Sequence, residues 1–285
     1  MYSLPQLPGA LRMHPRAWLR ALLLGVLAWL VVWAGGALAQ NLQPIPALTS
    51  HVIDTTGTLG GARDALEDKL AAFERSKGSQ IIVLMVATTQ PEDIVSYANR
   101  VGNTWKVGRK GVGDGLLLID SGGQYLGGTT DITRVWPIGQ VSAAMQRDYT
   151  LVLKGTIALS RARFPRGTLS PMLDAIARAP IWAEAMEFGH GTGHGVGYFL
   201  NVHEGPQSIS KAVPDAHMAM EPGMITSVEP GLYRDGQWGV RIENLVLNIA
   251  GPKNEFGEFL DFETLTLCPI DTRCIERTLM RAHEI

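Results

Sequence analysis

The sequence predicts an α/β fold, because helix-like and strand-like segments alternate along the chain. Residues 61–78 have apolar side chains at helical spacing and end at the stop signal Gly78. Residues 91–105 open on a proline and two acidic residues, which is typical of a first helical turn. The apolar segments 79–88 and 113–120 predict two buried strands on either side of this second helix.

Length and composition are those of an ordinary globular protein. With 285 residues, of which 46% are hydrophobic and 18% charged, the chain is long enough for one large domain or two modest ones. A net charge of -2 gives no basic footprint for nucleic acid. Cys268 and Cys274 have no His or Cys cluster beside them, so we expect a buried thiol or an optional disulfide there.

The first 39 residues have the pattern of a secretory signal. Arg16 and Arg20 precede an apolar run over 21–34, and an Ala-Leu-Ala cleavage pattern follows it. The run is shorter than the ~20 apolar residues of a membrane span. We therefore expect a signal peptide over 13–39, cut before Gln40, and a periplasmic or secreted mature chain. An uncleaved membrane anchor is the alternative.

The stretch "GHGTGHGVG" (189–197) alternates glycine with other residues and contains His190 and His194. A helix with this histidine pair is unfavourable, because each of the five glycines costs about 1 kcal/mol in a helix interior. A strand places both histidines on one face and the glycines on the other, where another backbone can approach closely. A glycine-rich loop with incidental histidines is the alternative.

Four acidic residues are hard to explain singly. Asp120 and Asp131 flank a turn signal at 126–128, so a hairpin would bring the two carboxylates together, where they repel unless a cation or proton intervenes. The alternative is two exposed hairpin acids. Glu229 and Glu243 each interrupt an apolar strand, and a buried glutamate is costly unless it is paired or binds metal.

The segment around Glu243, "GVRIENLVL", is expected to be a strand, in which successive side chains point to opposite faces. It places Arg241 beside Glu243 on one face, with Val240 and Ile242 on the other. Two Asp, two Glu and one His together suit two divalent cations, as in two-metal hydrolases. In this arrangement His194 is the imidazole ligand, and His190 lies near the substrate.

Residues 120–285 resemble the catalytic domain of aminopeptidase P, which has the pita-bread fold. The resemblance rests on these stretches: "DSGGQYLGGTTDITR", "HGTGHGVGYFLNVHEGP", "MEPGMITSVEPGLY", "GVRIENLVL" and "ETLTLCPID". It implies a dinuclear metal-dependent aminopeptidase that removes the N-terminal residue before proline. The implied partner is therefore a peptide with proline in second position.

The resemblance also implies residue roles. The ligands of two metal ions, usually Mn²⁺ with Co²⁺ or Zn²⁺ as further candidates, are Asp120, Asp131, His194, Glu229 and Glu243. Among them, Asp131 and Glu243 would bridge the ions, and Glu229 would handle the proton of the attacking water. The other implied catalytic residues are His190 and His203, which bind substrate, and Arg241, which orients the site.

Residues 40–119 resemble a truncated TPM domain, a family of envelope and thylakoid proteins, through "VIDTTGTL" and "WKVGRKGVGDGLLL". The sequence therefore predicts a chimera: a signal peptide over 1–39, a partial TPM-like βαβ unit over 40–119, and a partial pita-bread metallopeptidase domain over 120–285. The two families meet inside the strand "GLLLID".

The resemblance to aminopeptidase P also implies an upstream histidine in the substrate pocket, yet none lies between His51 and His190. We therefore expect metal binding with slow or undetectable turnover. Two other functions are open. One is a prolidase-like dipeptidase. The other is a non-enzymatic exported envelope module with a relic metal site, which touches the membrane only through an uncleaved signal segment.

Overall fold

The computed structural model describes residues 42–78, 80–107, 115–199 and 201–284. The predicted signal segment lies outside these ranges. Every helix within them is too short or too polar to span a membrane. Contacts divide the chain into a small unit, residues 1–44 and 88–93, and a large unit, residues 45–87 and 94–285. The large unit contains the secondary structure described below.

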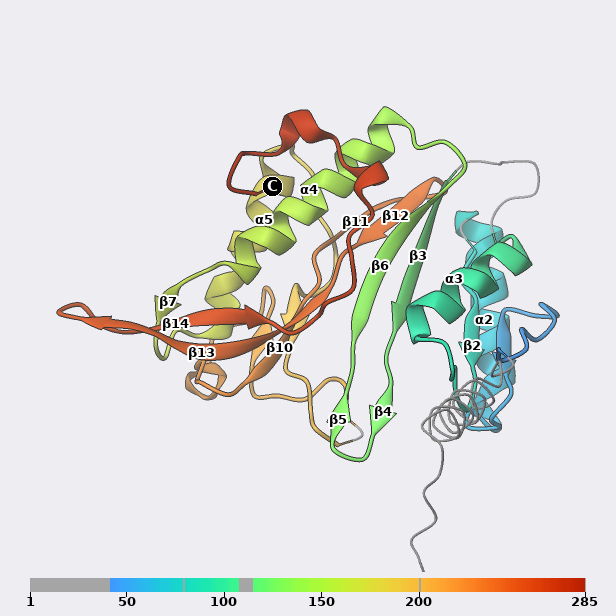
Figure 1. Cartoon of the computed structure of the whole chain (residues 1–285), viewed down its shortest axis with the longest axis horizontal. Helices are drawn as coiled ribbons and strands as arrows, with labels where there is room; N and C mark the ends of the chain where they lie inside the picture. The colour runs from blue at the N-terminus through green and yellow to red at the C-terminus, as the bar shows by residue number, and fades with distance from the viewer. Residues whose placement is uncertain (1–41, 79, 108–114, 200, 285) are drawn as a thin grey trace, which may run out of the picture. The chain divides into compact units, whose positions relative to one another are not determined.

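The large unit begins with a β–α–β arrangement (Figure 1). Strands β1 (Val52–Asp54) and β2 (Val83–Met85) pair in parallel, and helix α2 (Ala62–Lys77) connects them. The predicted helix stop at Gly78 is confirmed: it adopts a φ of 71° and donates its N–H to the carbonyl of Glu74. The prediction of a buried strand was wrong for β2, which is half-buried because its sheet has only two strands.

The second predicted helix is present as α3 (Ile94–Trp105), which begins three residues after Pro91. Strand β3 (Gly115–Ser121) follows it and runs antiparallel to β6 (Ile132–Ile138). The pair β4 (Gln124–Tyr125) and β5 (Gly128–Thr129) closes the predicted hairpin. β3 is half-buried rather than buried, because within the described ranges it pairs with β6 alone.

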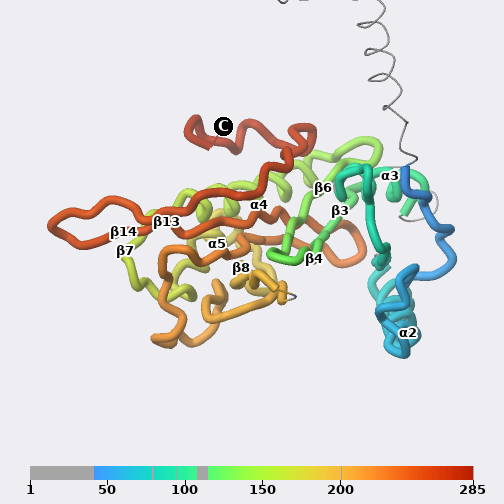
Figure 2. Tube along the Cα trace, turned by 60° about the horizontal axis from the view of Figure 1, so that its bottom comes forward, coloured from blue at the N-terminus to red at the C-terminus, as the bar shows by residue number. Residues whose placement is uncertain are grey.

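Helices α4 (Ala143–Ser160) and α5 (Asp174–Trp182) contact each other and form a helical layer in the C-terminal half of the large unit. Ser142 caps α4 by accepting the N–H of Met145. A four-stranded sheet has the order β10–β13–β14–β7, and the β13–β14 hairpin extends past β7 (Figure 2). The remaining strands pair as β8 with β9 and β11 with β12.

The bounds of these strands are β7 (Phe164–Pro165), β8 (Gly193–His194), β9 (Ser208–Ile209), β10 (Ile225–Val228), β11 (Gly231–Arg234), β12 (Trp238–Arg241), β13 (Asn244–Asn254) and β14 (Gly257–Thr264). Short 3-10 helices lie at Ser170–Leu173, Ala216–Met218, Thr272–Cys274 and Arg277–Leu279. Both cysteines are free thiols, and that of Cys274 is buried.

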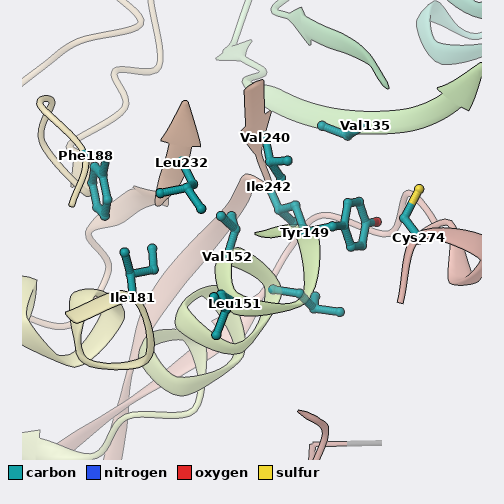
Figure 3. Close-up of a cluster of buried hydrophobic side chains, with 11 residues drawn as sticks. Val135, Tyr149, Leu151, Val152, Ile181, Phe188, Leu232, Val240, Ile242 and Cys274 are labelled. Carbon is teal, nitrogen blue, oxygen red and sulfur yellow. The ribbon is translucent and has the colours of Figure 1, made fainter. Parts of the chain in front are cut away.

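A hydrophobic core lies between α4 and the strands β6, β11 and β12 (Figure 3). Tyr149 and Val152 of α4 belong to the same buried cluster as Val240 and Ile242. The predicted alternation is therefore confirmed, because the two apolar residues face the core and leave the intervening Arg241 on the opposite face. Burial of this apolar face fixes which way the polar side chains point.

Candidate metal centre

The hairpin brings Asp120 and Asp131 together, as predicted. Asp120 lies near the end of β3 and Asp131 directly precedes β6. The strand register pairs Asp120 with Thr133 rather than with Asp131. One carboxylate oxygen each from Asp120, Asp131 and Glu243 nevertheless lie within 4.8 Å of one another. The alternative interpretation, in which Asp120 and Asp131 are two independent exposed acids of a hairpin, therefore does not describe this site.

The glycine-rich stretch forms a strand only at its centre, over Gly193 and His194, and His190 lies outside it. Its backbone runs against two neighbours. A Cβ at Gly193 would lie 1.9 Å from the carbonyl oxygen of Ser227, and one at Gly195 would lie 1.9 Å from that of Glu204. The predicted reason for the glycines is thereby confirmed: they permit the close backbone approach that places the His194 ring in the site.

We expect Gly193→Ala to destabilise the fold by about 1–3 kcal/mol, because the backbone must move to admit the methyl group. The same movement displaces His194, so metal binding weakens as well. Thermal unfolding and metal titration measure the two effects. Gly189→Ala is the matched control, because a Cβ there meets no atom within 4 Å. Equal stability of the two variants would contradict the close-approach argument.

The two glutamates occupy breaks between strands. Glu229 follows β10 and donates its N–H to the carbonyl of Thr192 over 2.7 Å. The single strand predicted around Glu243 was wrong: β12 ends at Arg241 and β13 begins at Asn244. The Glu243 N–H donates instead to the carbonyl of Thr133 over 3.1 Å, on β6. A change of pairing partner therefore interrupts the strand at Glu243.

The Glu243 carboxyl group is 1% exposed and only half satisfied. Its Oε2 accepts a hydrogen bond from the Thr133 hydroxyl over 2.8 Å. Its Oε1 is buried and has no hydrogen-bond partner among the residues that the structure describes. A buried polar atom without a partner costs about 1–3 kcal/mol. The donor set around this oxygen consists of carboxylates and imidazole, which is a suitable environment for a divalent cation.

All five predicted ligands meet in three overlapping groups. His194 belongs to two of them, one with Glu229 and Glu243 and one with Asp131 and His203. The His194 Nε2 lies 3.2 Å from Glu229 Oε1 and 3.6 Å from Asp131 Oδ2. The ring of His203 is 4.0 Å, centroid to centroid, from that of His194, and it is exposed. His203 therefore lies at the open side of the cluster.

Crowding of acids controls the electrostatics of the cluster. Burial, followed by the charges of Glu229 and Asp131, raises the pKa of Glu243 to about 8. Burial and the neighbouring Asp120 raise the pKa of Asp131 to about 6. Burial is the largest single influence on Glu229 and opposes its ionisation, but the hydrogen bonds from His194 and Ser227 and the charges of His194 and Arg241 together outweigh burial and lower the Glu229 pKa. The cluster therefore favours added positive charge, either protons or metal ions.

Arg241, on β12, contacts the cluster from one side. Its guanidinium pairs with Asp120 and lies 3.7 Å from Glu229 Oε2. It also donates to the Tyr233 hydroxyl over 3.0 Å, and the same hydroxyl is 2.8 Å from His190 Nε2. Burial lowers the pKa of His190 and raises that of Tyr233. Tyr233 thus links the two residues predicted to bind substrate and to orient the site.

The sequence interpretation did not identify Tyr233, Thr133 or Arg134. The hydroxyl of Thr133 lies between Arg241 Nε and Glu243 Oε2, at 3.2 and 2.8 Å. One signal was available for Thr133, because strand alternation after Asp131 places it on the same face as that acid. Tyr233 gave no such signal, because its phenol reaches the site only through the pairing of β11 with β12.

The mixed α/β fold brings four carboxylates and a histidine together at the ends of its strands. Such a set of ligands is suitable for a dinuclear metal centre. The model of metallopeptidase family M24 matches residues 59–248, and that of the C-terminal region of peptidase M24 matches residues 258–285. The first match covers more than half of the chain. The chain therefore belongs to metallopeptidase family M24, and the expected pita-bread relationship is confirmed.

Two similar proteins within this family are both described as probable Xaa-Pro aminopeptidases P. A probable Xaa-Pro aminopeptidase P from Fusarium vanettenii is 47% identical over 253 residues, covering 86% of this chain and 40% of the relative. One from Coprinopsis cinerea is 46% identical over 175 residues, covering 60% of this chain and 28% of the relative.

Among solved structures, X-prolyl aminopeptidase from Caenorhabditis elegans, described as a cytosolic enzyme with a di-nuclear active site, matches with a TM-score of 0.56 and 38% identity. That match covers 60% of this chain and 27% of the nematode chain. The chain thus spans less than half the length of each of these three relatives.

Proposed function

We propose that the chain binds two divalent metal ions and hydrolyses the peptide bond between an N-terminal residue and a following proline. The buried, half-satisfied carboxyl group of Glu243 within a cluster of four acids and His194 is the main support, because a bound cation would neutralise the cluster and satisfy the unpaired oxygen. The names of the relatives support the substrate class. A relic site in a non-enzymatic module is less well supported, because the complete ligand set is assembled.

Two bound divalent ions would supply Lewis acidity and an acidified water. Asp120, Asp131, His194, Glu229 and Glu243 would hold them, with Asp131 and Glu243 shared between the ions. We assign Mn²⁺ first, with Co²⁺ or Zn²⁺ as alternatives, because carboxylate-rich sites suit harder cations.

The chain's own residues have distinct roles in this proposal. Glu229 accepts the proton of the attacking water, and its lowered pKa keeps it ionised for that purpose. Arg241 holds Asp120 and Glu229 through its two ion pairs. His190, with its ring bonded to the Tyr233 hydroxyl, and the exposed His203 contact the peptide. We still expect slow turnover, because the sequence has no histidine between His51 and His190 to help position the substrate.

We expect the purified chain to bind up to two Mn²⁺, Co²⁺ or Zn²⁺ ions, because the clustered acids otherwise hold excess negative charge. Elemental analysis of folded protein gives the stoichiometry, and an Xaa-Pro tripeptide assay on the same sample gives the activity. The matched dipeptide substrate Xaa-Pro separates aminopeptidase from prolidase-like activity. Well under one ion per folded chain would contradict the metal centre.

We also propose that the chain is exported and that residues 40–119 form a TPM-like unit fused to the peptidase part inside residues 115–120. The β1–α2–β2 arrangement supports the first part of that unit. The family match that begins at residue 59 supports the competing view that this segment belongs to the peptidase.

We expect mass spectrometry of the native protein from the envelope or medium to find an N-terminus at Gln40, because the signal pattern ends there. The tryptic peptide over 111–134 crosses the proposed fusion point and reports on it in the same experiment. Protein that retains residues 13–39 would indicate an anchor instead. The fusion would be contradicted if the peptides before and after the junction came from two proteins of different mass and the peptide over 111–134 were not found.

A further inference from the structure

Arg134, on β6, is a buried cation that forms no ion pair with a carboxylate of the described residues. Its side chain is 3% exposed. A guanidinium has five N–H groups, and here each of them donates to an uncharged oxygen. NH1 donates to the carbonyls of Thr133 and Glu243 over 2.9 and 2.6 Å. Nε and NH2 donate to the carbonyl of Cys268 over 3.3 and 2.8 Å, and NH2 also donates to Asn244 Oδ1 over 2.8 Å.

These acceptors come from three parts of the chain: β6, the break between β12 and β13 together with the first residue of β13, and the segment after β14. The carbonyl of Thr133 accepts from Arg134 and also from the N–H of Glu243, over 3.1 Å. Arg134 and the backbone of Glu243 therefore share one acceptor, while Arg134 binds the carbonyl of Glu243 as well. This arrangement fixes the distance between the backbones of Thr133 and Glu243.

The position of the Glu243 side chain depends on that distance. The Thr133 hydroxyl donates to Glu243 Oε2, and Asp131 lies two residues before Thr133, directly ahead of β6. Asp131 and Glu243 are the two acids assigned to bridge the ions. A shift between the two backbones would separate them by the same amount.

We propose that Arg134 is a positioning residue of the metal centre: its guanidinium locks the backbones of Thr133 and Glu243 so that Asp131 and Glu243 face each other. The inference rests on the proposed dinuclear function. It assigns Arg134 no contact with metal, water or substrate. Its effect reaches the site through the Thr133 carbonyl and hydroxyl.

Arg134→Lys tests this role, because lysine keeps the charge and loses the rigid five-donor fork. Calorimetric titration of the metal-free full-length chain with Mn²⁺ gives the dissociation constants, and circular dichroism shows that the variant is folded. We expect at least one ion to bind tenfold or more weakly than in the wild type. The visible spectrum of the Co²⁺-loaded chain should change as well, because the ligand geometry changes.

Arg178→Lys is the matched control. Arg178 is 1% exposed and donates four hydrogen bonds, to Asp174, Glu187 and the carbonyls of Phe188 and His190. We expect this variant to lose stability and to keep wild-type metal affinity. If it weakens metal binding as much as Arg134→Lys does, the effect is general loosening and the inference fails.

If Arg134→Lys does not fold, Thr133→Val provides the second test, because it removes the hydroxyl that donates to Glu243 and keeps the side-chain volume. The same loss of affinity is expected. Wild-type affinity in a folded Arg134→Lys or Thr133→Val chain overturns the inference. A wild-type chain that binds two ions but cleaves peptides too slowly to detect bears only on the proposed activity and leaves this inference intact. A wild-type chain that binds no metal refutes both.

Discussion

Replacing Glu229 with glutamine should abolish hydrolysis of Xaa-Pro peptides by this chain. Glu229 Oε1 accepts a hydrogen bond from the Ser227 hydroxyl over 3.1 Å and lies 3.2 Å from His194 Nε2, while Oε2 lies 3.7 Å from Arg241. Glutamine keeps the size of the side chain, but its amide cannot take up the proton of the attacking water. A general base contributes about 10²–10⁴-fold to the rate, so little activity should remain.

The measurement is release of the N-terminal residue from an Xaa-Pro tripeptide at saturating Mn²⁺, with metal content determined on the same samples. Metal content separates loss of the proton acceptor from loss of an ion. Glu221→Gln is the control, because Glu221 pairs with Arg166 on the surface and lies outside the cluster. A Glu229→Gln chain that retains the wild-type rate would refute the assigned role.

The ligand cluster could be predicted because its residues violate ordinary strand chemistry. An acid that interrupts an apolar strand, as Glu229 and Glu243 do, has no favourable position unless something neutralises it. The direction of Glu243 followed from its apolar neighbours Val240 and Ile242, both of which are fully buried. Likewise, the glycines beside His194 have a cost that only a close backbone approach explains.

The features that could not be predicted depend on contacts between distant segments. Tyr233 lies over the backbones of Gly231 and Gly239, and a Cβ at either position would lie 2.9 Å or less from its ring or hydroxyl. In the sequence Arg134 is one polar residue of a strand, and all of its acceptors except the adjacent Thr133 carbonyl lie more than a hundred residues away. Local patterns contain no information on such acceptors. The half-exposed β2 has the same cause, because its burial depends on the number of strands in its sheet.

Removal of metal should make the stability of the chain fall as the pH rises from about 5 to about 8. The pKa of Glu243 is raised in the folded state from its ordinary value of 4.5 to about 8, by burial and then by Glu229 and Asp131. The folded chain therefore binds this proton more tightly than the unfolded chain does. Over the interval between the two pKa values, the free energy of unfolding decreases with pH by up to about 1.4 kcal/mol per unit.

The other groups of the cluster fit the same window. Asp131, with its pKa raised from 3.8 to about 6, adds to the decrease in the lower part. His194 also has a raised pKa, so its stabilising contribution is complete below its ordinary value of 6.5 and is lost as the pH rises further. Glu229 has a lowered pKa, and its contribution is lost only as the pH falls below about 4.5, outside the window.

Saturating Mn²⁺ should remove or reverse this slope, because the ions replace the protons and bind only the folded site. Urea unfolding between pH 5 and 8, with chelator or with Mn²⁺, measures the effect as a shift of the midpoint. Glu243→Gln should flatten the metal-free curve, since a neutral amide in the same place has no proton to lose. Glu258→Gln, on the exposed side of β14, should leave it unchanged. A metal-free midpoint that stays constant or increases over this range would show that Glu243 is ionised without a metal ion, and would remove the main argument for the dinuclear centre.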